Sequence, residues 1–457
     1  MLRQALSRSR QARGIASRLL NAGVVSAEGT GLRAITTSSL KAGALPIPTE
    51  AHGVNYHNPP MEGGYSFFMP RQTLIGPGAL KTAGDVVKSL GLKRALIVTD
   101  SGLAKSGALD PVLASLKAHD IEAVVFSGAM PNPTDRNVED ALAMLKENNC
   151  DFVVSVGGGS SHDCAKGTAL LATNGGRIHD YEGIGRLHAA PMPLVSVNTT
   201  AGTASEMTRF MVITDTTRLL KMVIADAGVT PAIAVDDPGM MMKMPKGLTA
   251  ATGMDALTHA IEAYMSVISN PVTDASGLHA MRLISAYLRT AVHDGANAQA
   301  RDMMSYAQFL GGMAFNSASV GLVHGMAHQL GAVYNLPHGV CNAVILPIVL
   351  EFNAEAVPHR FIDIAEALGL GQLSFEEAPG KVIEAVRELS ADIGIPANLE
   401  VLGVKPEDFP LLADKTEVDI CCMTNPRPAS KEQIIELFRK AYEQGSEGQP
   451  TKQAAAA

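Results

Sequence analysis

From about residue 65 onward, short apolar runs rich in β-branched residues alternate with segments whose apolar positions recur at a helical period. One such segment, VEDALAMLKENN (138–149), predicts a helix. The runs that predict strands are RALIVTD (94–100), EAVVFSG (122–128), DFVVSVGGGS (151–160), PLVSVNTT (193–200) and AIAVDD (232–237). Because strands separated by helices favour βαβ units, this part of the chain predicts an α/β, Rossmann-like domain with a mostly parallel sheet.

The pattern changes after Asp237. Long stretches rich in Ala, Met and Leu follow, with apolar residues spaced as on one face of a helix, over residues 247–266, 276–292 and 302–315. We therefore predict a boundary near residues 238–246, with an α/β dinucleotide-binding domain at 65–240 and an all-helical domain at 241–447.

The first forty residues differ from the rest. Residues 1–41 carry six arginines and Lys41 against a single acid, Glu28, which gives a net charge of 7 − 1 = +6. Arginine-rich, serine-containing and acid-poor segments are typical of organelle transit peptides, so residues 1–41 predict import into the mitochondrial matrix, with another organelle as the alternative. A basic arm that binds an anionic partner would have the same composition.

Composition narrows the class of protein. The 457 residues are 46% hydrophobic and 18% charged, as in globular proteins, and the net charge of −8 argues against nucleic-acid binding. No apolar run reaches the length of a membrane span, which predicts no membrane partner. The five cysteines form no CxxC pair, which argues against a cysteine-built zinc site.

Glycines and hydroxyl residues follow the predicted strands. Gly157, Gly158, Gly159 and Ser160 come directly after one strand and before a helix, where small residues let backbone N–H groups approach a pyrophosphate. A tight turn without a ligand would use the same residues.

Two further segments invite a similar pair of interpretations. The segment NTTAGTASEMT (198–208) follows the next strand and can bind a cofactor, or cap a helix through Thr203 and Glu206. Asp100 ends the strand at 94–100, where a carboxylate can bind the adenosine ribose and disfavour a 2′-phosphate, or cap the following helix.

A metal site is predicted in the helical half. DALTHAIEAY (255–264) places Asp255 and His259 on one helical face, which for an isolated pair indicates a surface ion pair. The segment GLVHGMAHQLGAVYNLPHGV adds His324, His328 and His338 within fifteen residues. Imidazole and carboxylate ligands suit zinc or iron(II). A polar network in a helical core is the alternative.

These motifs, together with PNPT (131–134), resemble the iron-containing (group III) alcohol dehydrogenases, in particular the branch of ethanol and lactaldehyde reductases. The resemblance covers residues from about 65 to 440. It implies an α/β NAD domain joined to a helical metal domain, as in dehydroquinate synthase-like folds, and a homodimer or a higher homo-oligomer. It implies Fe²⁺, with Zn²⁺ as the alternative, bound by Asp255, His259, His324 and His338. The NAD-binding residues that it implies are Asp100, Asn132, Gly158, Gly159, Ser160, Asp163, Thr199, Thr200, Thr203, Thr208 and Lys221.

The resemblance also implies a reaction. A divalent metal acting as a Lewis acid favours the alkoxide of a small alcohol, whose carbon passes hydride to NAD and yields an aldehyde. His328 could relay the proton or pack beside the metal. Phe210 would fill the substrate pocket and favour ethanol over diols, or belong to the core.

Other activities on the same scaffold are alternatives. A hydroxyacid–oxoacid transhydrogenase of this family would carry an insertion in the second histidine motif, which is uninterrupted here. A 4-hydroxybutyrate or diol dehydrogenase is a further alternative. A metal- and NAD-dependent lyase would need a basic cluster for its anionic substrate, and a non-catalytic derivative would have lost a ligand or a glycine.

Overall fold

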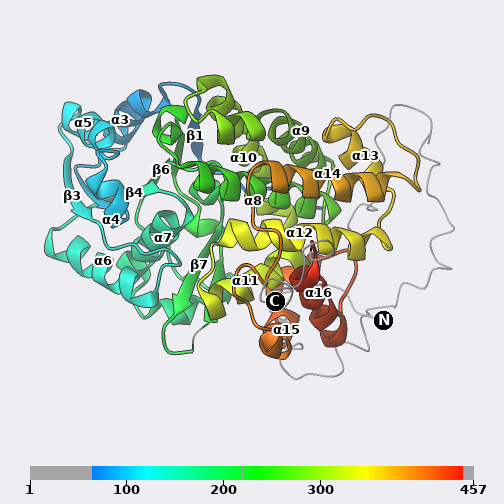
Figure 1. Ribbon diagram of the computed structural model, residues 1–457. Coiled ribbons are helices and arrows are strands. Elements are labelled where there is room, and N and C mark those ends of the chain that lie inside the picture. The colour runs from blue at the N-terminus through cyan, green and yellow to red at the C-terminus, as the bar shows by residue number, and fades with distance from the viewer. Residues whose placement is uncertain (1–63, 219, 446–457) are drawn as a thin grey trace, which may run out of the picture. The chain divides into compact units, whose positions relative to one another are not determined.

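The computed structural model describes residues 64–218 and 220–445. Contacts group the chain into Met1–Ser66 and a compact unit, Phe67–Ala457, and it is this second unit that Figure 1 presents as labelled elements. The predicted transit peptide at 1–41 lies outside the described residues. No helix among those described combines the length and the apolar composition that a bilayer crossing requires.

The first half is built on a six-stranded sheet in which every pairing is parallel, with the order β1-β9-β6-β4-β2-β3. Its strands are β1 (Gln72–Ile75), β2 (Arg94–Val98), β3 (Glu122–Phe126), β4 (Phe152–Gly157), β6 (Leu194–Asn198) and β9 (Ile233–Asp236). The five runs predicted as strands are β2, β3, β4, β6 and β9, so the α/β prediction is confirmed. β2 and β4 are neighbours in the sheet, but the chain continues from β2 to β3 on one side and from β4 to β6 on the other. In such sheets, ligands bind at the carboxyl ends of the two strands where the strand order reverses.

Side chains that alternate along the strands enter two different cores. Ala95 and Ile97 of β2 pack with α3 (Ala79–Ser89) and α5 (Asp110–Ala118). Leu96 and Val98 pack on the other face with α6 (Asp135–Glu147) and α7 (Gly159–Asn174). The short helix α4 (Ser101–Lys105) contributes Ala104 to the first of these cores. The helix predicted at 138–149 is α6, and it begins three residues earlier because Thr134 forms a capping box with Asn137.

A second, three-stranded sheet was not predicted. It has the order β5-β8-β7 and comprises β5 (Gly183–Ile184), β7 (Phe210–Asp215) and β8 (Leu220–Ala225). β7 and β8 form an antiparallel hairpin whose buried side chains, among them Met211 and Ile224, join the core of α6 and α7. This hairpin carries Phe210 and Lys221, two of the predicted site residues.

The second half is helical, as predicted, and Figure 1 shows its helices together beyond β7. Its long helices are α8 (Lys246–Met265), α9 (Pro271–His293), α10 (Ala298–Ala318), α11 (Leu322–Tyr334), α12 (His338–Ala354), α13 (Arg360–Ala367), α14 (Ala378–Asp392), α15 (Phe409–Glu417) and α16 (Lys431–Glu443). Short 3-10 turns complete the fold: η2 (Ile178–Tyr181), η3 (Ser205–Met207), η4 (Ala227–Val229), η5 (Pro238–Met241), η6 (Pro406–Asp408) and η7 (Ile420–Thr424). The last strand ends at Asp236 and α8 begins at Lys246, on either side of the interval in which we placed a boundary. The division into two domains stays a prediction, because contacts join both halves in one unit.

The helical half is organised around α8. Every residue of α8 from Thr249 to Met265 is buried, because α9, α10 and α12 all pack against it. A helix buried on every side is composed mainly of small and apolar residues. Polar side chains on it therefore face other protein groups rather than water.

Candidate metal centre and cofactor site

Asp255 and His259 lie one turn apart on α8 and are both buried, with 2% and 5% of their surfaces exposed. The alternative of a surface ion pair is therefore wrong. Burying a carboxylate requires compensation by hydrogen bonds, an opposite charge or a metal.

Two neighbouring helices bring further histidines to the same place. His324 lies in the first turn of α11, and His338 is the first residue of α12. The turn between these helices is made by Asn335, whose left-handed φ of 54° ends α11. The Nε2 atoms of His338 and His324 lie 3.6 and 3.8 Å from Asp255 Oδ1.

The four predicted ligands converge. One donor atom from each of Asp255, His259 and His324 lies within 4.8 Å of the others. The ring centroids of His259 and His324 are 4.6 Å apart, and those of His324 and His338 are 5.1 Å apart. Three helices thus place one carboxylate and three imidazoles around a common point.

Asn342, which sequence reasoning missed, marks that point. Its amide nitrogen Nδ2 lies 2.7 Å from Asp255 Oδ1 and 3.1 Å from Nε2 of both His324 and His338. An amide nitrogen has only two hydrogens, so it cannot satisfy all three acceptors at once. The sequence does place Asn342 four residues after His338, one turn further along α12, which would have indicated that both side chains share a helical face.

The histidines have the protonation state that metal ligation requires. Burial lowers the pKa of His259 to about 4 and that of His324 to about 3, and burial also lowers the pKa of His338 well below its ordinary value. All three rings are therefore neutral near pH 7. Asp255, His259 and His324 are buried and the His338 side chain is 28% exposed, and this set of neutral imidazoles with one carboxylate fits a divalent iron or zinc ion.

His328 lies beside these ligands without belonging to the Asp255 cluster. Its ring is stacked on that of His338 at a centroid distance of 5.4 Å. Its Nδ1 lies 3.0 Å from Asp419 Oδ2, and Gln329 Nε2 donates to the same oxygen. Asp419 lies 91 residues away in sequence, and nothing in the sequence indicated this contact.

Phe210 is connected to the candidate metal centre through another aromatic ring. Its ring is stacked on Phe315 of α10 at 6.4 Å, and Phe315 is stacked on His259 at 4.1 Å. Arg209 lies over the Phe210 ring at 4.9 Å. Two phenyl rings thus form an apolar surface that reaches a predicted metal ligand.

The glycine-rich turn and the threonine-rich segment lie side by side. β4 and β6 are adjacent parallel strands, and the Thr199 N–H donates to the Gly157 carbonyl at 3.0 Å. A Cβ at Gly158 would lie 3.0 Å from Thr200, and one at Gly159 would lie 3.1 Å from Thr203. The close packing of these segments therefore excludes larger residues.

Gly158, Gly159 and Ser160 form the N-terminal end of α7. Thr203 Oγ1 accepts from the N–H of Ser205, the first residue of η3, but forms no capping box with Glu206. Exposed N–H groups of a helix N-terminus at the carboxyl edge of a parallel sheet suit a pyrophosphate.

Asp163 and Thr208 belong to a buried cluster centred on Lys166. Asp163 accepts from Ser205 Oγ at 2.7 Å and from the Val212 N–H at 2.9 Å. Lys166 Nζ donates to Ser205 Oγ, Thr208 Oγ1 and the Phe210 carbonyl at 3.1, 3.3 and 2.6 Å. Burial lowers the pKa of Lys166 to about 8. These residues tie α7 to the segment before β7.

The remaining candidates lie in different surroundings. Asp100 is the N-cap of α4, since its Oδ1 accepts from the N–H groups of Gly102 and Leu103 at 2.8 and 2.9 Å. Asn132 Nδ2 donates to Asn335 Oδ1 at 2.7 Å, which links the PNPT loop to the end of α11. Lys221 also reaches α11, because a Cβ at Gly331 would lie 2.9 Å from its Nζ.

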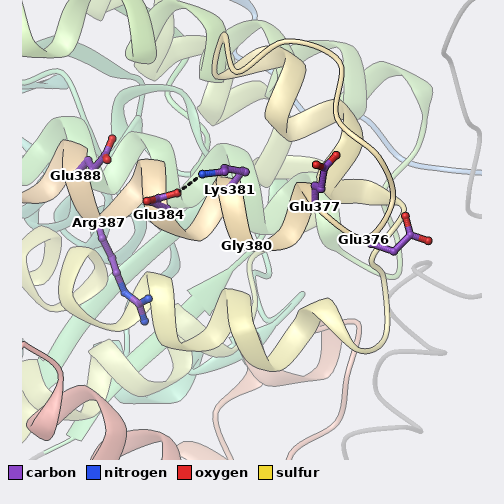
Figure 2. A pocket seen from close by; sticks show the side chains of 7 residues that line it. All are labelled: Glu376, Glu377, Gly380, Lys381, Glu384, Arg387 and Glu388. Atoms are coloured by element: carbon purple, nitrogen blue, oxygen red, sulfur yellow. Dashed lines mark hydrogen bonds and ion pairs between the residues drawn. The ribbon is translucent and has the colours of Figure 1, made fainter.

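A hollow of about 710 Å³ lies elsewhere, along the outward side of α14, as Figure 2 shows. Its one interaction between side chains is the ion pair of Lys381 with Glu384, at 2.8 Å. The residues that line it are all exposed: Glu376, Glu377, Gly380, Lys381, Glu384, Arg387 and Glu388. None of them is a predicted site residue, and an exposed charged helix face lacks the apolar lining of a small-molecule site.

Comparison with known proteins agrees with this geometry. Residues 70–238 match the family described as iron-containing alcohol dehydrogenase, and residues 249–442 match the C-terminal part of the same family. The chain is 48% identical to 1,3-propanediol dehydrogenase of Citrobacter freundii over 83% of its own length and 99% of that protein. It is 49% identical to alcohol dehydrogenase 4 of Saccharomyces cerevisiae over 82% and 98%. The solved structure of an alcohol dehydrogenase from Oenococcus oeni superimposes with a TM-score of 0.82 at 44% identity, over 83% of this chain and all of that one.

Proposed function

The chain belongs to the iron-containing alcohol dehydrogenase family, and we propose that its preferred substrates are ethanol and acetaldehyde. It is an NAD-dependent oxidoreductase that interconverts alcohols and aldehydes with a divalent metal, for which Fe²⁺ is the family's ion. The observation that carries the metal-dependent chemistry is the convergence of Asp255, His324 and His338 on one point, and the stacked rings of Phe210 and Phe315 carry the preference for a small substrate.

The residues divide into four groups by role: metal ligands, a proton-transfer residue, NAD-binding residues and residues that limit the substrate. Asp255, His259, His324 and His338 hold the metal ion. When bound, that ion polarises the substrate oxygen as a Lewis acid and the nicotinamide carries the hydride. The candidate ligands lie on the helices α8, α11 and α12, and sites built on regular elements hold their ligands more precisely than sites on loops.

His328 moves the proton of the substrate hydroxyl. Because its Nδ1 is engaged by Asp419, Nε2 is the ring atom available to the substrate. The stacked ring of His338 keeps the imidazole plane fixed. Proton transfer by His328 requires that its ring lie beside the metal ligands. The contacts of this ring with those of His324 and His338 support that position.

NAD binds along the carboxyl edge of the parallel sheet. The start of α7 would hold the pyrophosphate, and the hydroxyl residues after β6 would provide further hydrogen bonds to the cofactor. The residues to which we assign this role are Asp100, Asn132, Gly158, Gly159, Ser160, Asp163, Thr199, Thr200, Thr203, Thr208 and Lys221. Asp163 and Thr208 act by holding the segment 205–212 in place, because their polar atoms are engaged by Ser205, Val212 and Lys166.

Phe210 and Phe315 limit the size of the substrate. Two stacked phenyl rings next to His259 leave an apolar surface that suits the methyl group of ethanol better than a second hydroxyl. The relatives named for 1,3-propanediol act on a longer diol, so substrate size is the property to measure.

The test is an anaerobic assay of NADH oxidation by Fe²⁺- and Zn²⁺-loaded protein with acetaldehyde, glycolaldehyde, lactaldehyde and succinic semialdehyde. We expect the highest kcat/KM with acetaldehyde. A preference for succinic semialdehyde would contradict the proposal and favour a 4-hydroxybutyrate dehydrogenase or the transhydrogenase activity.

We also propose that residues 1–41 direct the protein to the mitochondrial matrix and that the mature enzyme is a homodimer or a higher homo-oligomer. Fusing residues 1–41 to a fluorescent reporter should send it to mitochondria, whereas a diffuse cytosolic signal would contradict the first proposal. Sedimentation of the protein without these residues should give at least the mass of a dimer, and a monomer would contradict the second.

A further inference from the structure

Glu262 lies on the same face of α8 as two predicted metal ligands. It follows Asp255 by seven residues and His259 by three, which is the spacing of one helical face. Only 5% of its surface is exposed. Its side chain must therefore find partners within the protein.

Both carboxylate oxygens of Glu262 are engaged at the start of α11. Oε2 lies 2.5 Å from Nδ1 of His324, and Oε1 accepts from the Val323 N–H at 2.7 Å. A Cβ at Gly321 would lie 2.9 Å from Oε1, so the glycine leaves room for this contact. One carboxylate thus contacts both the backbone that begins the helix and the ring that the helix carries.

These contacts determine which nitrogen of His324 can bind a metal. The Asn342 amide nitrogen is a donor and lies 3.1 Å from Nε2 of His324, so Nε2 is the accepting nitrogen and the ring proton is carried on Nδ1, which donates to Glu262 Oε2. Nε2 is then left with a free lone pair. Nε2 is also the atom that lies 3.1 Å from Asn342 Nδ2 and 3.8 Å from Asp255 Oδ1, at the point where the donor atoms converge.

We propose that Glu262 is a positioning residue of the metal centre, which sets the tautomer and the orientation of His324 and so strengthens metal binding. The inference rests on the proposed role of His324 as a ligand. Carboxylates behind ligating histidines fix the ring and raise its basicity, and their loss weakens metal binding about 10- to 100-fold.

The position of Glu262 is also favourable for the helix. The first N–H groups of α11 have no partners within the helix, and the helix dipole favours a negative charge at that end. A second side chain shares this structural role without touching a ligand: Asn425 Oδ1 accepts from the Leu322 N–H at 3.1 Å. Asn425 therefore offers a matched control.

The experiment compares Glu262→Gln with Asn425→Ala in the full-length protein. His324 and Val323 contact different oxygens of Glu262, and a glutamine has an oxygen at only one of these two positions and an NH₂ group at the other, so it cannot accept from both. Zn²⁺ affinity of the metal-free protein is measured by competition with a chelator, and the absorption of the Co²⁺-loaded protein reports the ligand geometry. We expect Glu262→Gln to bind Zn²⁺ about 10- to 100-fold more weakly with an altered Co²⁺ spectrum. Asn425→Ala should keep the affinity and the spectrum of the unmodified protein even if it melts at a lower temperature.

Two outcomes would overturn the proposal. The first is Zn²⁺ affinity within twofold of the unmodified protein in Glu262→Gln, and the second is an equal loss in Asn425→Ala, which would mean that only the helix start matters. If Glu262→Gln does not fold, ¹⁵N shifts of the histidine rings in the unmodified Zn²⁺-loaded protein give the tautomer directly, and a His324 ring with the proton on Nε2 would overturn it. Failure of the metal site itself is distinguishable, because the unmodified protein would then bind no stoichiometric Zn²⁺.

Discussion

The phenyl ring of Phe315 lies parallel to the imidazole of His259, with 4.1 Å between ring centroids and 19° between the planes. The same phenyl ring is stacked on Phe210 of the β7 strand. The wall that we assign to the substrate is therefore in direct contact with a residue that we assign to the metal. If these assignments hold, one side chain of α10 joins the substrate wall to the metal centre.

Shortening Phe210 should change which alcohols the enzyme prefers. Phe210→Leu removes the ring that stacks on Phe315, so the ratio of kcat/KM for 1-butanol to that for ethanol should rise roughly tenfold, the value expected for a difference of a methylene or two in an apolar pocket. Phe309→Leu, in the same apolar cluster, is the control and should leave the ratio unchanged. An unchanged ratio in Phe210→Leu would mean that Phe210 is a core residue that does not contact the substrate.

Asp100 should determine the preference for NAD over NADP. Asp100→Asn keeps an N-cap of equal quality but removes the negative charge, so kcat/KM for NADP⁺ should rise relative to NAD⁺. Asp100→Gly should give the same direction of change. If the ratio stays constant in both variants, Asp100 serves only as the cap that its contacts with Gly102 and Leu103 form.

Buried neutral His162 should make the protein sensitive to acid. Burial lowers the pKa of His162 to about 3, so between pH 6.5 and about 3 the unfolded chain binds a proton at this site that the folded chain does not. Stability should consequently fall as the pH is lowered through this range, with a contribution of up to about 1.4 kcal/mol per pH unit from this residue. His162→Gln, which can still pair with Ser155, should show a shallower slope when urea unfolding is measured at several pH values. Parallel slopes for the two proteins would contradict this role.

The strands of the parallel sheet were predictable because strands buried on both faces are continuous apolar runs, as in RALIV and FVVSV. β7 was missed although FMVITD alternates buried and half-buried positions, as a strand with one covered face does. The threonine-rich segment before it was interpreted as a cofactor-binding or helix-capping segment, and β7 was not separated from it. β1, with four residues, is too short to stand out from its surroundings.

The candidate ligands could be proposed from the sequence because they fall in two short segments, 255–259 and 324–338. The residues that hydrogen-bond to these histidines could not be predicted, because the contacts join distant segments. Asp419 contacts His328 across 91 residues of sequence, and Glu262 contacts His324 across 62. Glu262 at least shares a helical face with Asp255 and His259, which is a signal that sequence alone contains. Which helix start it would face is set by the packing of both α8 and α11 against α12.

The substitution His259→Ala tests the central claim most directly. The ring of His259 belongs to the donor cluster with Asp255 and His324, while the proposed NAD residues lie on other elements. Metal content is measured by mass spectrometry and NADH binding by fluorescence, with His279→Ala, an exposed histidine of α9, as the control. We predict that His259→Ala loses both bound metal and turnover yet still binds NADH, while His279→Ala keeps all three. Stoichiometric metal and near-normal turnover in His259→Ala would contradict the account.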